Sequence, residues 1–118
     1  MATVLIIDDN PQMAELIQEM VRIVGYETIL TDNAPDGLAQ ARDQEPDAIL
    51  LDLMMPEYDG WEVYDQLRAF TDAPIFFVTA HNTPANVARA KELGAAGMLG
   101  KILTPIDLAQ RLRQALGE

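Results

Sequence analysis

The chain has 118 residues, of which 19 are acidic and 8 basic, a formal net charge of −11, and no cysteine. A domain of this length buries roughly two thirds of the surface that its unfolded chain exposes, so it needs no metal or disulfide for stability. The lack of cysteine excludes disulfides and thiolate metal sites, and no apolar run approaches the ~18 residues of a membrane span. We therefore expect a soluble cytoplasmic protein without membrane contact.

The first half of the chain alternates short apolar runs with helical patterns. The runs TVLII at 3–7 and ETILT at 27–31 predict two strands. From Pro11 to Val24 the apolar residues recur at helical spacing, and Gly25 then ends the predicted helix. Asn33, with Pro35 in the first turn, predicts the start of a second helix.

The second half repeats this alternation. Three more strands are predicted by the apolar runs at 48–51, 74–79 and 97–100. A third helix is expected from about residue 59 to residue 70, and N-cap threonines followed by proline predict two more after Thr83 and Thr104. Five strands in alternation with five helices indicate a parallel sheet covered by helices on both faces.

Polar side chains stand where the predicted strands end. Asp8 and Asp9 follow the first strand, Asp52 follows the third, Thr79 ends the fourth and Lys101 follows the fifth. The carboxyl ends of parallel strands share one edge of the sheet, and ligands bind there. The sequence therefore predicts one site that contains all of these side chains.

The three aspartates of this edge need a partner. Two carboxylates about 5 Å apart repel by roughly 3 kcal/mol at an effective dielectric near 20. Either one of them holds a proton or a hard cation lies among them. Oxygen ligands without histidine or cysteine favour Mg²⁺ or Ca²⁺, and a site with few protein ligands favours Mg²⁺. With a lysine and a hydroxyl nearby, this set of groups suggests phosphoryl transfer.

The whole chain resembles the receiver domains of bacterial two-component response regulators. The resemblance rests on the segments VLIIDDN, DAILLDLMMPEYDGWEV, PIFFVTA and KELGAAGMLGK, of which DLMMPxxDG at 52–60 is the most specific. It implies one receiver domain over residues 1–118 with a flavodoxin-like, doubly wound α/β fold. In that fold five helices flank a five-stranded parallel sheet of order 2-1-3-4-5. It also implies no enzymatic activity beyond the domain's own phosphorylation and dephosphorylation.

The resemblance assigns a role to each residue of the predicted site. Asp52 matches the phosphoacceptor, whose carboxylate attacks the phosphorus of a phosphohistidine. Asp9, Asp52 and the backbone carbonyl of Met54 would bind Mg²⁺, and Asp8 would hold a water molecule of the metal. Lys101 would pair with the phosphoryl oxygens.

The remaining family positions concern conformational change. Thr79 would swing toward the phosphoryl group and so convert phosphorylation into a backbone shift. Pro56 and Gly60 would shape the loop after the phosphoacceptor, with a positive φ expected at Gly60.

Two residues depart from the family pattern. Ile102 replaces the proline that usually follows the lysine, and a trans peptide bond is expected before it because a cis bond costs about 3–4 kcal/mol there. Met98 replaces an aromatic residue that normally takes part in the conformational switch, so altered or weakened output coupling is expected. Met54 and His81 occupy positions that tune hydrolysis of the acyl phosphate. Their bulk predicts a long phosphoryl lifetime; the alternative is that the two side chains merely pack against their neighbours.

The partners follow from the same resemblance. A sensor histidine kinase or a histidine phosphotransfer protein would dock near the first helix and the loop after Asp52. A downstream protein or a covalently linked output domain would receive the signal. The acidity opposes direct nucleic-acid binding by this domain. Residues 81–118 hold five of the 8 basic and three of the 19 acidic residues, so this part could form a homodimer, although a solvated face is the simpler explanation.

Two other functions stay open. A Mg²⁺-dependent phosphohydrolase could use a strand-end aspartate, but such enzymes commonly have an aspartate two residues further on, where this chain has Met54. A protein-binding module could keep the fold and lose regulated phosphorylation. The substitutions at Met98 and Ile102 would suit it, whereas the complete set of acids, threonine and lysine argues against it.

Overall fold

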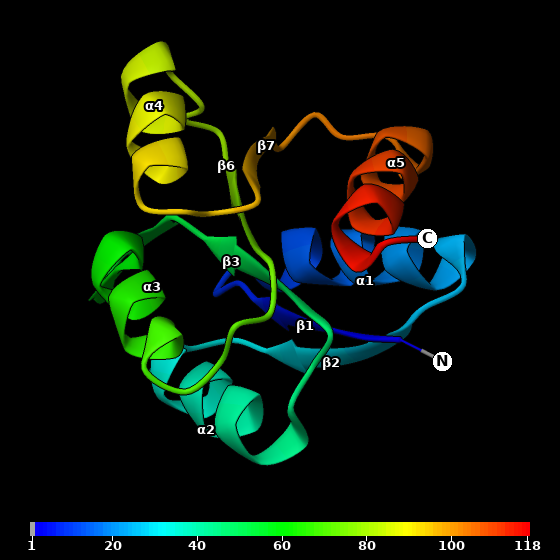
Figure 1. The fold of residues 1–118 in the computed structure, drawn as a ribbon, viewed down its shortest axis with the longest axis horizontal. Helices are drawn as coiled ribbons and strands as arrows, with labels where there is room; N and C mark the ends of the chain where they lie inside the picture. Colours follow the sequence, from blue (N-terminus) through cyan, green and yellow to red (C-terminus); the bar gives the residue numbers. More distant parts are fainter. Residues whose placement is uncertain (1) are drawn as a thin grey trace.

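The computed structural model describes residues 2–118 as five βα units that form one layered domain (Figure 1). The elements in chain order are β1 (Thr3–Ile7), α1 (Pro11–Val24), β2 (Glu27–Thr31), α2 (Ala34–Gln44), β3 (Ala48–Asp52), β4 (Met54–Met55), β5 (Tyr58–Asp59), α3 (Gly60–Arg68), β6 (Ile75–Thr79), α4 (Pro84–Glu92), β7 (Gly97–Gly100) and α5 (Pro105–Leu116). None of these helices is long and apolar enough to cross a membrane.

Five strands form a parallel sheet in the order β2-β1-β3-β6-β7. Counted without the short β4 and β5, this is the expected order 2-1-3-4-5. The central strands β3 and β6 are buried along their whole length, as their continuous apolar sequences predict. The strand order reverses between β1 and β3, so the carboxyl ends of these two strands flank the place where such sheets bind ligands.

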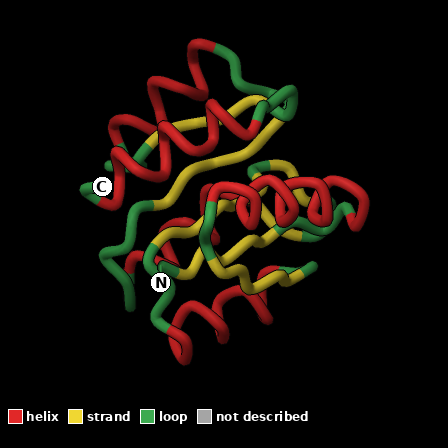
Figure 2. Tube along the Cα trace, turned by 90° about the vertical axis from the view of Figure 1, so that its right-hand side faces the viewer, coloured by secondary structure: helices red, strands yellow, loops and turns green. Residues whose placement is uncertain are grey.

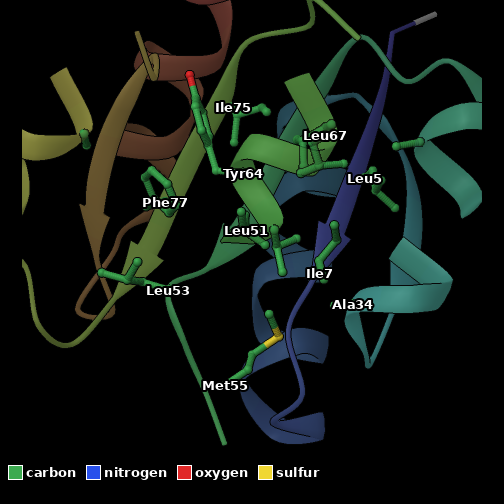
Figure 3. Packing of buried hydrophobic residues seen from close by; sticks show 14 of the residues in the cluster. Leu5, Ile7, Ala34, Leu51, Leu53, Met55, Tyr64, Leu67, Ile75 and Phe77 are labelled. Carbon is green, nitrogen blue, oxygen red and sulfur yellow. The ribbon is translucent and has the colours of Figure 1, made fainter. Parts of the chain in front are cut away.

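Helices cover both faces of the sheet (Figures 1 and 2). On one face α1 and α5 pack on a core that includes Ile6, Leu50 and Val78. On the other face α2, α3 and α4 enclose a second core around Leu51 and Phe77 (Figure 3). Alternate strand residues thus point to opposite cores, which fixes the register of each strand and the direction of its last side chain.

The helix boundaries follow local capping chemistry. Asn33, Thr83 and Thr104 each accept a hydrogen bond from a backbone N–H of the first turn, as predicted. Gly25 ends α1 in the left-handed conformation, with φ of 109°. Because these signals are local, the sequence predicts them well.

The segment after Asp52 differs from the expectation. Residues 54–59 form a small antiparallel hairpin of β4 and β5, and α3 is shorter than predicted. The prediction of a positive φ at Gly60 is wrong: the glycines with positive φ among the described residues are Gly25, Gly94 and Gly117. What requires glycine at position 60 is space: a Cβ atom there would lie 2.5 Å from the carbonyl oxygen of Leu53.

Candidate functional site

The sheet brings the predicted acids together at one edge. Asp8 and Asp9 directly follow β1, and Asp52 is the last residue of β3. One carboxylate oxygen from each residue lies within 4.8 Å of those of the other two. Lys101, directly after β7, points its ammonium into the same group. Four of the five predicted side chains therefore converge.

Two of the acids are buried and held by backbone groups. Asp8 is 1% exposed and Asp52 is 2% exposed. The N–H of Asn10 donates to Oδ1 of Asp8 at 2.9 Å, and the N–H of Met54 donates to Oδ1 of Asp52 at 3.1 Å. The Oδ2 atoms of both residues face Lys101, whose Nζ lies 3.6 Å from Asp8 and 3.4 Å from Asp52.

This environment changes the protonation of Asp52. Burial raises the pKa of its carboxyl group, and the negative charge of Asp8 raises it further. The N–H of Met54 and the charge of Lys101 act in the opposite direction. The net result is a pKa of about 6, against an ordinary value of 3.8. One lysine therefore does not compensate the acids of this site.

The unmatched charge fits a hard cation. Oδ2 of Asp8 is buried and has no hydrogen-bond partner among the described residues. An orphaned carboxylate oxygen beside two further carboxylates is the donor set that Mg²⁺ prefers, and it contains no histidine or cysteine. His81, the only histidine of the sequence, lies outside this group of acids. The residues present thus suit Mg²⁺.

Thr79 is at the predicted edge, but its hydroxyl is bonded elsewhere. The residue is completely buried, and Oγ1 accepts a hydrogen bond from the N–H of His81 at 3.0 Å. The carbonyl of His81 in turn accepts from the side chain of Asn86 at 2.8 Å. Thr79 is paired in the sheet with Gly100, the residue before Lys101. Its position is as expected, while contact with the acids would require a rotation of its side chain.

A shallow cleft of about 680 Å³ opens above the acids. It is lined by Asp9, Asn10, Pro11, Gln12, Asp52, Met54, Pro56 and Lys101. The side chain of Met54 is 57% exposed at its rim, so it is free to lie over the cleft. This volume admits a phosphoryl group together with part of its donor.

The two departures from the family pattern have different surroundings. The peptide bond before Ile102 is trans, as expected, and the side chain of Ile102 is fully exposed. Met98 is buried beside Phe77 in the core shared by α3 and α4. Trp61 and Tyr64 of α3 also pack against Phe77, with ring centroids 4.8 and 5.4 Å away.

Sequence reasoning missed one buried polar residue near the acids. Thr31 ends β2, its hydroxyl donates to the carbonyl of Ile6 at 3.0 Å, and its own carbonyl accepts from the N–H of Asp8 at 3.1 Å. The signal was present, because Thr31 is a strand-end polar residue like Thr79. It was overlooked because β2 is an edge strand of mixed polarity.

Comparison with known proteins gives concordant matches. The family model "Response regulator receiver domain" matches residues 4–113. The DNA-binding response regulator MtrA of Mycolicibacterium smegmatis is 34% identical over 113 residues, which are 96% of this chain and 50% of that protein. The transcriptional regulatory protein YvrH of Bacillus subtilis is 33% identical over 116 residues, 98% of this chain and 49% of that protein. The chain thus spans about half the length of the curated relatives it matches.

Among solved structures, the chemotaxis protein CheY4 of Vibrio cholerae superposes with a TM-score of 0.90 at 28% identity. The match covers 98% of this chain and 99% of that chain. The fold, the convergent acids with their lysine, and the matched family model agree. The chain belongs to the family of response regulator receiver domains, the phosphoacceptor modules of two-component systems.

Proposed function

We propose that Asp52 is the phosphoacceptor of this receiver domain. The observation that carries the proposal is the convergence of Asp8, Asp9 and Asp52 within 4.8 Å beneath an open cleft, with the ammonium of Lys101 3.4 Å from Asp52. Asp9 and Asp52 both line the cleft, but of the three acids Asp52 alone is the last residue of the central strand β3 and lies 3.4 Å from Lys101.

The reaction is a transfer of one phosphoryl group. An Oδ atom of Asp52 forms a bond to phosphorus, while the bond from phosphorus to the donor's leaving atom breaks. That atom is a nitrogen in a phosphohistidine and an oxygen in acetyl phosphate. The bonding electrons leave with it, and a leaving imidazole nitrogen takes its proton from solvent. Lys101 stabilises the charge on the transferring oxygens, because its Nζ already lies beside Asp52.

Mg²⁺ belongs to the same proposal. Asp9, Asp52 and the backbone carbonyl of Met54 would hold it, with Asp8 close by. When bound, it supplies positive charge that offsets the repulsion between the carboxylates and an incoming phosphoryl group. The residues around it keep Asp52 oriented, since the N–H of Met54 fixes one of its two oxygens.

The signal would leave the site through Thr79 and α4. A hydroxyl that turns from the N–H of His81 toward a phosphoryl group alters the loop before α4, to which Asn86 is bonded. We propose a sensor histidine kinase or histidine phosphotransfer protein as the donor and a cytoplasmic setting for the exchange. The two relatives are named as a DNA-binding response regulator and a transcriptional regulatory protein, and both are about twice as long as this chain. A downstream protein or a linked output domain is therefore the proposed target.

The test is phosphorylation by a small-molecule donor. The protein and its Asp52→Asn variant are incubated with acetyl phosphate and MgCl₂, and the intact masses are measured. A single phosphoryl adduct on the wild type that is absent from the variant supports the proposal. Asp59→Asn is the matched control, since Asp59 is an exposed aspartate that caps α3 outside the acidic cluster; it should keep the adduct.

Two outcomes would contradict the proposal. An adduct that persists in Asp52→Asn places the acceptor elsewhere. No adduct on the wild type, at a Mg²⁺ concentration that stabilises the protein against unfolding, favours a binding module without regulated phosphorylation.

A further inference from the structure

We infer that Thr31 is a positioning residue for the acidic cluster, acting through the backbone that carries Asp8 and Asp9. Four polar residues are buried in the described part of the chain: Asp8, Thr31, Asp52 and Thr79. Three of them belong to the proposed phosphorylation site. The fourth, Thr31, lies on the neighbouring strand and has no role in that chemistry. The inference rests on the proposed function, because the property that Thr31 would control is the affinity for Mg²⁺.

Thr31 holds the end of β1 at two points. Its hydroxyl donates to the carbonyl of Ile6, and its carbonyl accepts from the N–H of Asp8. Thr31 is the sheet partner of Ile7, the residue between these two contacts. The last residue of β1 and the first acid of the site are thus bracketed by hydrogen bonds from a single residue.

On the side of β2 and α2, the backbone at Asp8 is not covered by close packing. A cleft of about 450 Å³ lies there, lined by Asp8, Pro11, Ala14, Glu15, Leu30, Thr31, Asp32, Asp36, Ala39 and Gln40. β2 is an edge strand, and Thr31 is its one buried residue. On the β2 side the hydrogen bonds of Thr31 therefore help to hold this backbone, while pairing with β3 holds it on the other side.

The position of this backbone matters for a cation. The N–H of Asn10 fixes Oδ1 of Asp8, so Oδ2, which has no hydrogen bond and faces Lys101 at 3.6 Å, moves with the main chain. Asp9 follows on the same backbone. Groups that orient metal ligands typically change metal affinity by about 10- to 100-fold when they are removed. Loss of the Thr31 hydroxyl should therefore weaken Mg²⁺ binding while the ligands themselves stay intact.

The experiment measures Mg²⁺ affinity by isothermal titration calorimetry with MgCl₂, without any phosphodonor. Thr31→Val removes the hydroxyl and keeps the shape of the side chain. Thr31→Ala removes both the hydroxyl and the methyl group, and Thr31→Ser keeps the hydroxyl but lacks the methyl group. Thr28→Val is the matched control, because the Thr28 hydroxyl, three residues earlier on β2, accepts a hydrogen bond from Gln18 far from the acids. We expect the Mg²⁺ Kd to rise about tenfold in the valine and alanine variants, and to stay within twofold of wild type in Thr31→Ser and Thr28→Val.

The midpoint of thermal unfolding in EDTA separates positioning from folding. A merely structural role lowers this midpoint in Thr31→Val and leaves the Kd of the folded protein unchanged, which would overturn the inference. Equal weakening in Thr31→Ser would overturn it too, since packing of the methyl group would then be responsible. If the wild type itself does not bind Mg²⁺, the proposed metal site fails, and this result is distinct from unchanged affinity in the variants.

Discussion

The Nζ atom of Lys101 lies 3.4 Å from Oδ2 of Asp52, yet the pKa of Asp52 is raised to about 6. Burial and the nearby Asp8 thus outweigh both the ammonium and the hydrogen bond from Met54. With this pKa Asp52 is largely ionised at pH 7, where the folded protein holds a buried negative charge that one lysine does not offset. The free-energy cost of ionising Asp52 in the folded protein is therefore measurable as a dependence of stability on pH.

In EDTA, Asp52→Asn should become increasingly more stable than wild type as the pH rises from 4 to 7. Between the ordinary pKa of 3.8 and the folded value of about 6, the folded wild type binds more protons than the unfolded chain. Its free energy of unfolding therefore falls across this window. The difference between the two proteins should grow by about 2–3 kcal/mol, measured by urea unfolding at several pH values.

Saturating MgCl₂ is the control for this experiment. It should stabilise the wild type at pH 7 more than Asp52→Asn and so reduce the difference. A constant difference between the unfolding free energies of the wild type and Asp52→Asn across the pH range would contradict the raised pKa of Asp52.

Lys101→Met should raise the pKa of Asp52 further. The ammonium lies within 4 Å of both Asp8 and Asp52, and its charge lowers the pKa of Asp52 in the wild type. An opposite charge at this distance typically shifts a carboxyl pKa by about one unit or more. The measurement is a ¹³C NMR titration of the aspartate carboxyl groups in EDTA. Lys91→Met, an exposed change on α4, should leave the Asp52 titration unaltered.

The predictable parts of the structure are those with local causes. The N-caps at Asn33, Thr83 and Thr104 depend on neighbouring residues, and the buried strands depend on continuous apolar runs. The convergence of Asp8 with Asp52 was also predictable, because parallel strands have their carboxyl ends at the same edge. Sequence and chain topology together therefore sufficed for the acids.

The features that the sequence did not predict depend on contacts whose geometry only the folded chain defines. The need for glycine at position 60 comes from the backbone of Leu53, which the hairpin brings within 2.5 Å of a Cβ atom. The hydroxyl of Thr79 has a backbone partner that a strand pattern does not reveal. Thr31 does fit the strand-end pattern, but the cleft beside it, on which its inferred role depends, is formed by residues distant in the sequence.

Gly60→Ala should disturb the site through the segment that follows Asp52. The added methyl group would lie 2.5 Å from the carbonyl oxygen and 2.7 Å from Cα of Leu53, so this backbone must move. Overpacking of this kind costs about 1–3 kcal/mol, and phosphorylation by acetyl phosphate should slow. Chemical denaturation and the rate of adduct formation give the two measurements.

Gly94→Ala is the matched control for Gly60→Ala. Gly94 has a φ of 87°, with Tyr64 as its nearest neighbour at 3.8 Å, so alanine there suffers backbone strain without a clash. It should lose stability by about 1–2 kcal/mol and keep its phosphorylation rate. If Gly60→Ala were also phosphorylated at the wild-type rate, the link between Leu53 and the site would be wrong.

Arg89→Ala should loosen α4. The guanidinium of Arg89 lies 4.3 Å from the ring centroid of Trp61 on α3, and Ala90 is the one buried residue among the described residues of α4. A cation–π contact at an exposed site contributes about 0.5–1 kcal/mol. Trp61 is the single tryptophan, so its fluorescence reports the contact directly. Lys91→Ala on the same helix should leave the emission unchanged, and an identical effect of both variants would argue against a specific role of Arg89.

Met54→Ala should shorten the lifetime of the phosphoryl group on Asp52. The half-exposed methionine lines the cleft together with Asp52 and Lys101, so its side chain can cover the phosphorus from attack by water. His81 is exposed and does not line this cleft, so His81→Ala is the natural comparison and should have the smaller effect. Decay of the adduct is followed by intact mass after removal of the donor. Decay at the wild-type rate in Met54→Ala would show that the methionine does not obstruct water, and faster decay in His81→Ala alone would assign the shielding to the other side of the site.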